Sequence, residues 1–209
     1  MASDMTAAIG RYVNGKIMPL QRGVLAENPA AKATLARLRA DIDGRGTNWM
    51  DIGNDLYGDW PTESLGDPDR NPRAVAAVST ALGLYALHQQ SKTTAVAQVD
   101  TLETRSISFG AACRQIVTDP DSGMNDDAAK GVVRRLSAAE SAPTFEGIVW
   151  FLRALIMLMR ASGRDISLDY RRFAQDLYLL QFPEYANQVF QRWSCDFYYR
   201  PASTRNTSK

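Results

Sequence analysis

Few side chains in this 209-residue chain have the types and spacing that catalysis requires. The chain has one histidine, His88, which follows Leu87 on an apolar segment of helical character. Acid–base catalysis needs a partner within hydrogen-bond distance, and the sequence near His88 supplies none. We therefore interpret His88 as a packed or helix-capping residue. The chain also lacks the G-x-S-x-G, Walker A and G-x-G-x-x-G motifs.

The cysteines and carboxylates do not form a pattern of metal ligands. Cys113 and Cys195 stand far apart in the chain, and together with His88 they lack the close spacing of a zinc site. The acidic run DPDSG at 119–123 resembles the start of a calcium loop, but the closing bidentate glutamate is absent. Proline and glycine at these positions favour a turn. We expect no metal, no cofactor and no catalytic residue, so the protein is not expected to be an enzyme.

Arginine is the residue type whose abundance suggests a function. Of the 24 basic residues, 19 are arginine, which binds phosphate through a planar fork of N–H donors. The net charge is only +1, but the charges are segregated along the chain. Residues 1–40 carry a net charge of +4, residues 41–70 carry −6 and residues 170–209 carry +3. A nearly neutral protein of this kind can still present one basic face to a polyanion.

Several arginines are placed so that they share helix faces with other charged residues. Glu146, Arg153 and Arg160 are seven residues apart, so they form one narrow polar stripe on an otherwise apolar helix. This stripe is either the solvent edge of a buried helix or a surface that faces phosphate, and both interpretations stay open. Two pairs at i,i+4 spacing predict ion pairs that hold the helices: Arg172 with Asp176, and Arg192 with Asp196.

The elements that position these residues are predicted to be helices throughout. Asn28 and Asn71 each precede a proline, which is typical of a helix start, and Asn125 and Thr144 are further predicted caps. No segment alternates as a strand would. We predict an all-α fold, a single-domain multi-helix bundle of about eight helices without significant sheet. The predicted helices lie near 4–18, 29–41, 72–91, 106–118, 126–140, 145–162, 169–181 and 184–198.

The single helical domain is expected to span residues 1–200, with two irregular segments. Residues 42–70 are acidic and rich in Gly, Asp and Pro, so we predict a long loop or insertion with room for one helical turn. Residues 201–209 are polar and are expected to form a disordered tail.

The sequence shows no sign of secretion or of a membrane span. Residues 1–15 lack the apolar run of a signal peptide. The most apolar stretch, 147–159, is interrupted by Arg153 and is shorter than the roughly 20 residues that a spanning helix needs. We expect a cytoplasmic protein with reduced cysteines and no membrane contact.

Four ordered blocks of residues resemble the CasB family, the small subunit of the type I-E CRISPR Cascade complex. They are YALHQQS at 85–91, SFGAACR at 108–114, LDY at 168–170 with Asp176 and Leu177, and WSCDFY at 193–198. The resemblance runs from about Arg37 to Arg200. It implies a non-catalytic helical subunit of antiviral defence, present in two copies beside the backbone and large subunits. It also implies contacts to crRNA and to the target and non-target DNA strands, which would stabilise the R-loop.

The resemblance also implies which residues bind nucleic acid. The family pattern places basic residues at positions that this chain fills with Arg37, Arg114, Arg134, Arg135 and Arg153. Family members often have His-Leu-Arg where this chain has Phe151-Leu152-Arg153, so the pattern is incomplete at that position. A basic track of this kind would bind the sugar-phosphate backbone without sequence preference.

Two other functions compete with this interpretation. The first is a free-standing helical adaptor or scaffold with no nucleic-acid role, whose arginines only form ion pairs. The second is a helix-turn-helix regulator, which is less favoured because no short helix pair with a glycine turn contains a basic recognition helix.

Overall fold

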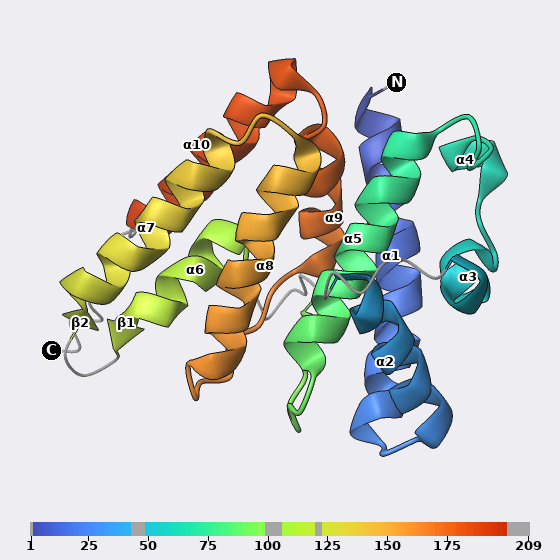
Figure 1. The fold of residues 1–209 in the computed structure, drawn as a ribbon, viewed down its shortest axis with the longest axis horizontal. Coiled ribbons are helices and arrows are strands. Elements are labelled where there is room, and N and C mark those ends of the chain that lie inside the picture. Colours follow the sequence, from blue (N-terminus) through green and yellow to red (C-terminus); the bar gives the residue numbers. More distant parts are fainter. Residues whose placement is uncertain (1, 43–48, 99–105, 120–122, 200–209) are drawn as a thin grey trace, which may run out of the picture.

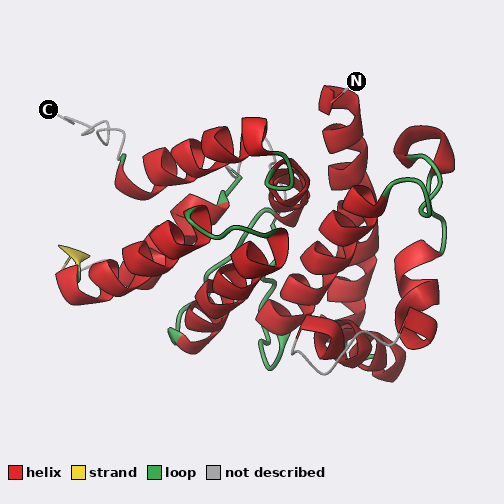
Figure 2. Cartoon of the chain, turned by 45° about the horizontal axis from the view of Figure 1, so that its top comes forward, coloured by secondary structure: helices red, strands yellow, loops and turns green. Residues whose placement is uncertain are grey.

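The all-α prediction is confirmed by the computed structural model, which describes residues 2–42, 49–98, 106–119 and 123–199. Within these ranges the structure has ten helices (Figures 1 and 2). The strands β1 (Thr118–Asp119) and β2 (Gly123–Met124) form one antiparallel ladder of two residues each. The helices are α1 (Ala2–Leu25), α2 (Pro29–Ile42), α3 (Trp49–Tyr57), α4 (Thr62–Leu65), α5 (Pro72–Gln89), α6 (Phe109–Val117), α7 (Asp126–Glu140), α8 (Phe145–Ala161), α9 (Tyr170–Leu179) and α10 (Pro183–Tyr198).

Side-chain caps explain why six of these helices begin where they do: Ser108 caps α6, and five further caps share one geometry. Each of these five caps accepts a hydrogen bond from the backbone N–H three residues further on, at N···O distances of 2.9 to 3.2 Å. Such a bond satisfies one of the backbone donors that a helix leaves unpaired in its first turn. These five capping residues are Asn28, Asn71, Asn125, Thr144 and Asp169.

The prediction of a long loop at 42–70 is wrong, because the structure places α3 and α4 within this segment. Ile52 and Leu56 are four residues apart and both are buried, as is Leu65 of α4. These few apolar residues provide little helical periodicity in the sequence. The helices form because those residues pack against the rest of the protein, which contributes more than propensity. The expected tail at 201–209 lies outside the described residues.

Helix α1 continues past residue 18, where the sequence predicted its end. Pro19 stands inside the helix, although proline removes one backbone hydrogen bond and favours a break. Gln21 and Val24, beyond the proline, are both buried. Gln21 exchanges two hydrogen bonds with the backbone of Ala97, at 2.8 and 3.0 Å. These contacts hold the last turns of α1 against the protein and offset the cost of the proline.

The helices form two groups that meet at α5, α8, α9 and α10 (Figure 1). Helices α1, α2, α5 and α9 pack together, with α3 and α4 on their outer side, and α6, α7, α8 and α10 form the second group. Helix α5 lies between α1, α2, α8 and α9, and every residue from Thr80 to Gln89 is buried. One continuous cluster of buried apolar side chains extends through both groups.

None of the helices in the described ranges is long and apolar enough to cross a bilayer.

Candidate nucleic-acid interface

Arg37, the first predicted nucleic-acid contact, is engaged in an ion pair with the acidic 42–70 segment. Its Nη2 and Nε lie 2.9 and 3.1 Å from Oδ2 of Asp55 in α3, and Nη2 also donates to Thr34 Oγ1 at 2.8 Å. The Asp55 side chain is only 15% exposed, whereas that of Arg37 is 40% exposed. Arg37 therefore holds α3 against α2, and any contact with phosphate would compete with Asp55.

Arg114, in the last turns of α6, binds the C-terminal end of α10. Its Nη1 donates to the backbone oxygen of Phe197 at 2.7 Å and to that of Tyr198 at 3.3 Å. The last carbonyls of a helix lack partners within the helix and carry partial negative charge, so a guanidinium is favourable there. This contact gives Arg114 a structural role that does not depend on nucleic acid.

Arg134 and Arg135 of α7 differ from those two arginines. Arg134 is exposed, and no hydrogen bond or ion pair with other parts of the described chain engages its guanidinium. Arg135 is half-buried and donates one bond, from Nη1 to the oxygen of Gly131 at 2.9 Å in its own helix. Lys130, one turn earlier, is exposed and lies 3.1 Å from Asp127. The exposed guanidinium of Arg134 is therefore available to bind phosphate oxygens.

Arg153 is half-buried in α8 and lines a groove between α5 and α8, where Glu146 is also present. The polar stripe predicted from Glu146, Arg153 and Arg160 also contains two apolar side chains. Trp150 and Met157 lie on the same face and are 64% and 36% exposed. Arg160 donates to Gln90 at the end of α5. This face is therefore mixed, with one aromatic and one aliphatic side chain between the charges.

The five predicted residues are thus distributed over both helix groups. Arg37 lies on α2 in one group, whereas Arg114, Arg134, Arg135 and Arg153 lie on α6, α7 and α8 in the other. Their contact with nucleic acid stays a prediction.

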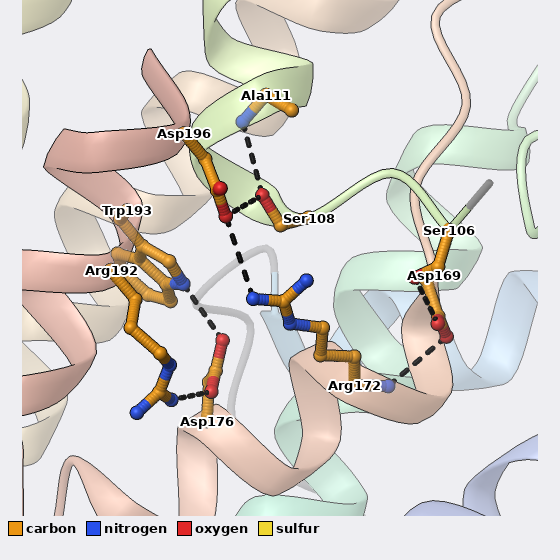
Figure 3. A network of polar contacts seen from close by, with 9 residues as sticks. All are labelled: Ser106, Ser108, Ala111, Asp169, Arg172, Asp176, Arg192, Trp193 and Asp196. Carbon is orange, nitrogen blue, oxygen red and sulfur yellow. Dashed lines mark hydrogen bonds and ion pairs between the residues drawn. The ribbon is translucent and has the colours of Figure 1, made fainter. Parts of the chain in front are cut away.

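The charged residues of α9 and α10 form a polar network with the start of α6 (Figure 3). Asp176 Oδ1 accepts a bond from Arg192 Nη2 at 2.6 Å, and its Oδ2 accepts one from Trp193 Nε1 at 2.7 Å. Arg172 Nη2 lies 3.5 Å from Asp196 Oδ2. The ion pairs therefore form between α9 and α10, and not within each helix as the i,i+4 spacing predicted. Burial raises the pKa of Asp176, and the charge of Arg192 and the two donors oppose that rise.

Ser108 and Asp169 extend this network toward the segment that precedes α6 (Figure 3). Ser108 Oγ donates to Asp196 Oδ2 at 2.6 Å and caps α6 by accepting from the N–H of Ala111 at 3.3 Å. Asp169 caps α9 and accepts a bond from Ser106 Oγ at 2.6 Å. The blocks at 108–114, 168–170 and 193–198 thus meet in one place and join three helices.

The fourth block, 85–91, also makes contacts within the protein interior. His88 Nδ1 lies 3.2 Å from the hydroxyl of Tyr170, and the rings of Tyr85 and Tyr170 pack edge to face. Gln89 holds the chain that follows α5, since its Nε2 donates to the oxygen of Thr94 at 2.9 Å. Burial lowers the pKa of His88 to about 3, with smaller contributions from the charges of Lys92 and Arg160. At neutral pH the imidazole is therefore uncharged.

The burial of His88 and Cys113 makes both of them unsuited to contact a ligand. His88 is fully buried, so it cannot meet a substrate. Burial also raises the pKa of Cys113, which keeps that thiol protonated and unreactive. Within the described ranges, no three His, Cys, Asp or Glu side chains lie close enough to hold a metal ion. Arginines and aromatic side chains are among the exposed groups of the described residues, and such groups bind phosphates, bases or protein surfaces.

Two exposed aromatic residues beside the groove of Arg153 were not among the residues predicted from the sequence to bind. Trp49 and Trp150 are 49% and 64% exposed, and both line this groove. Trp150 could have been found from its spacing, because it follows Glu146 by four residues and precedes Arg153 by three. A tryptophan on the polar stripe of an apolar helix indicates an exposed binding residue.

Comparisons with known proteins point to one family. The family model of CRISPR-associated protein Cse2 matches residues 33–198. A crystal structure of CasB from Thermobifida fusca matches with a TM-score of 0.70 and 30% sequence identity. That match covers 92% of this chain and 98% of the CasB chain. Among curated protein sequences, none matches significantly.

Proposed function

The chain belongs to the Cse2 (CasB) family of CRISPR-associated proteins, and on this basis we propose that it is the small subunit of a type I-E Cascade complex. In this proposal the subunit is non-catalytic and acts in the cytoplasm in antiviral defence. Two copies lie beside the backbone and large subunits and the crRNA. They stabilise the R-loop by binding the sugar-phosphate backbone of the target and displaced strands.

The observation that carries this proposal is the family match over most of the chain, together with the exposed guanidinium of Arg134 on α7. In such complexes, base pairing with the guide RNA determines which target sequence is bound, and the protein contacts the sugar-phosphate backbone. A single exposed arginine contributes little by itself. Two copies held side by side by other subunits would contact a longer stretch of the sugar-phosphate backbone. Binding of one copy then favours binding of the other, which raises the overall affinity without new contacts.

The test compares the complex with and without this chain at two salt concentrations. We expect both complexes to retain the crRNA. Duplex target should bind less tightly, and the R-loop should dissociate faster, when the chain is missing. The two affinities should converge as salt rises, because the complex with more phosphate contacts has the steeper salt dependence. Equal affinities and R-loop lifetimes at both salt concentrations would refute the strand-stabilising role.

The adaptor function remains the second candidate, and the contacts of two arginines favour it. Arg37 is paired with Asp55, and Arg114 binds the end of α10, so both guanidinium groups serve the fold. If the complex behaves identically with and without the chain at both salt concentrations, the adaptor becomes the better explanation.

A further inference from the structure

We propose that the groove between α3, α5 and α8 is a docking site for an apolar, basic segment of a neighbouring protein subunit. The groove has a volume of about 1020 Å³. Its walls include Trp49 of α3, Val75 of α5, and Val149 and Trp150 of α8. The inference rests on the proposed function in one respect, which is that the neighbour is a subunit of the same complex.

The apolar character of the groove is the first reason for a protein occupant. Trp49 and Trp150 leave about half or more of their surface in solvent, and Met50, next to Trp49, is 91% exposed. Large apolar side chains gathered around a concave surface are typical of interaction sites, and tryptophan is enriched among the residues that dominate binding energy. An amphipathic helix that lays its apolar face into such a groove is a common mode of recognition.

The charges at the groove select the kind of partner. The exposed carboxylates of Asp69 and Glu146 line it, against the half-buried Arg153. Residues 41–70, which supply the α3 side, carry a net charge of −6. Such a rim repels a phosphodiester backbone and attracts lysine and arginine, so complementarity favours a basic protein segment over nucleic acid. In this proposal Arg153 lines a protein site, in place of the nucleic-acid contact that the family resemblance implied.

The chain's own neighbouring segment is unsuited to fill the groove. Residues 43–48 connect Ile42 to Trp49, and both of these line the groove. Their sequence, DGRGTN, contains no large apolar side chain. Residues 200–209, with the sequence RPASTRNTSK, contain none either. Neither of these two segments supplies apolar side chains that would cover Trp49 and Trp150.

The first test replaces Trp150 with alanine and measures how tightly the chain joins a complex purified without it. The matched control is Tyr198→Ala, because Tyr198 is 59% exposed on α10 and does not line the groove. We expect Trp150→Ala to join about 10- to 100-fold more weakly and Tyr198→Ala to join as the unmodified chain does. Thermal unfolding of both variants should match that of the unmodified chain, since each side chain is largely exposed.

A second pair of variants tests the charge of the partner. Replacing Asp69 and Glu146 with lysine should slow association with the complex, because rim charges act mainly on the association rate. The control is Glu184→Lys, which changes an exposed carboxylate in the first turn of α10. Faster association of the Asp69→Lys, Glu146→Lys variant would overturn the assignment of a basic partner.

Four other outcomes would overturn the inference. If Trp150→Ala joins the complex normally while the unmodified complex still stabilises the R-loop, the proposed function stands and the groove has no docking role. If Trp150→Ala instead weakens binding of the isolated chain to single-stranded DNA, the occupant is nucleic acid. Loss of self-association in Trp150→Ala would identify a second copy as the occupant. If the unmodified chain joins no complex, the proposed function fails and the inference fails with it.

Discussion

His88 places an uncharged imidazole in the centre of the molecule. Its Nδ1 contacts Tyr170, and its Nε2 has no hydrogen-bond partner within the described structure. Burial lowers its pKa to about 3, whereas an unfolded chain has a histidine pKa near 6.5. Between these values the unfolded state binds the proton more readily than the folded state. The free energy of unfolding therefore falls as the pH is lowered from about 6.5 toward 3.

We predict that His88→Asn reduces this pH dependence. The histidine contributes a slope of at most about 1.4 kcal/mol per pH unit, and asparagine cannot titrate in this range. Urea unfolding of both proteins at pH 7.5, 6 and 5 measures the two slopes. All carboxylates are common to both proteins, so the difference between the slopes isolates His88. Parallel dependences would show that His88 titrates alike in the folded and unfolded states.

Replacing a surface arginine should affect nucleic-acid binding or protein stability, depending on whether other residues of the protein already bind its guanidinium. We predict that Arg134→Ala with Arg135→Ala lowers the salt dependence of single-strand binding by about 0.7 in log K per log salt for each phosphate contact that the substitutions remove. Thermal stability should change little, because Arg134 engages no described partner and Arg135 donates one bond within its own helix. An unchanged affinity and salt dependence would show that neither residue contacts nucleic acid.

Arg37→Ala is the contrasting variant for that experiment. It leaves the mostly buried carboxylate of Asp55 without its ion pair, so stability should fall by about 1 kcal/mol. Because its guanidinium is already engaged, single-strand binding should keep its salt dependence. A lower salt dependence in Arg37→Ala would instead show that Arg37 contacts phosphate.

Among the helices, α10 is held by a close backbone contact and by a buried carboxylate. An added Cβ at Gly110 of α6 would lie 2.1 Å from the oxygen of Trp193 and 2.7 Å from its Cα. Backbone atoms cannot yield as a flexible side chain can. Asp176 of α9 also accepts hydrogen bonds from Trp193 Nε1 and Arg192 Nη2 of α10. Gly110, Asp176 and Trp193 therefore lie where α6, α9 and α10 pack together.

We predict that Gly110→Ala lowers the free energy of unfolding by roughly 3 kcal/mol or more, since overpacking costs about 1–3 kcal/mol even where side chains can adjust. The matched control is Gly15→Ala in α1, where nothing lies within 4 Å of an added Cβ. Alanine there should stabilise the helix by about 0.5–1 kcal/mol. Chemical denaturation of both variants measures the difference. Similar effects in the two variants would show that α6 and α10 do not approach so closely.

Across the whole molecule, the acidic segment lies far from α7 along the longest axis (Figure 1). Helices α3 and α4, which belong to the acidic 41–70 segment, lie at one end of the longest axis, and α7 with Arg134 lies toward the other (Figure 1). The charges of α7 itself balance, with three basic and three acidic residues, and Arg134 is exposed among them. A subunit organised in this way can present its acidic, apolar groove to protein while its α7 side remains available to nucleic acid. Both the strand-stabilising role and the docking site depend on this arrangement.

The helical architecture and the family could both be predicted from the sequence. Caps such as Asn71 and Asn125 act on a backbone N–H only three residues away, so local sequence predicts where their helices start. The four blocks that resemble CasB supply contacts between helices, and the resemblance could be recognised from them. Three of the blocks pack α6, α9 and α10 together, and the block at 85–91 packs α5 against Tyr170 of α9.

Which charges pair and which aromatic residues remain exposed depends instead on tertiary packing. The spacing predicted Arg172 with Asp176 and Arg192 with Asp196, yet the observed pairs exchange partners between α9 and α10. An arginine reaches any carboxylate within several ångströms, so its partner depends on how helices pack. The same reason explains α3, whose Ile52 and Leu56 form a helix only against the rest of the protein. Trp150 remains exposed because α8 packs its other faces against α5, α6 and α7.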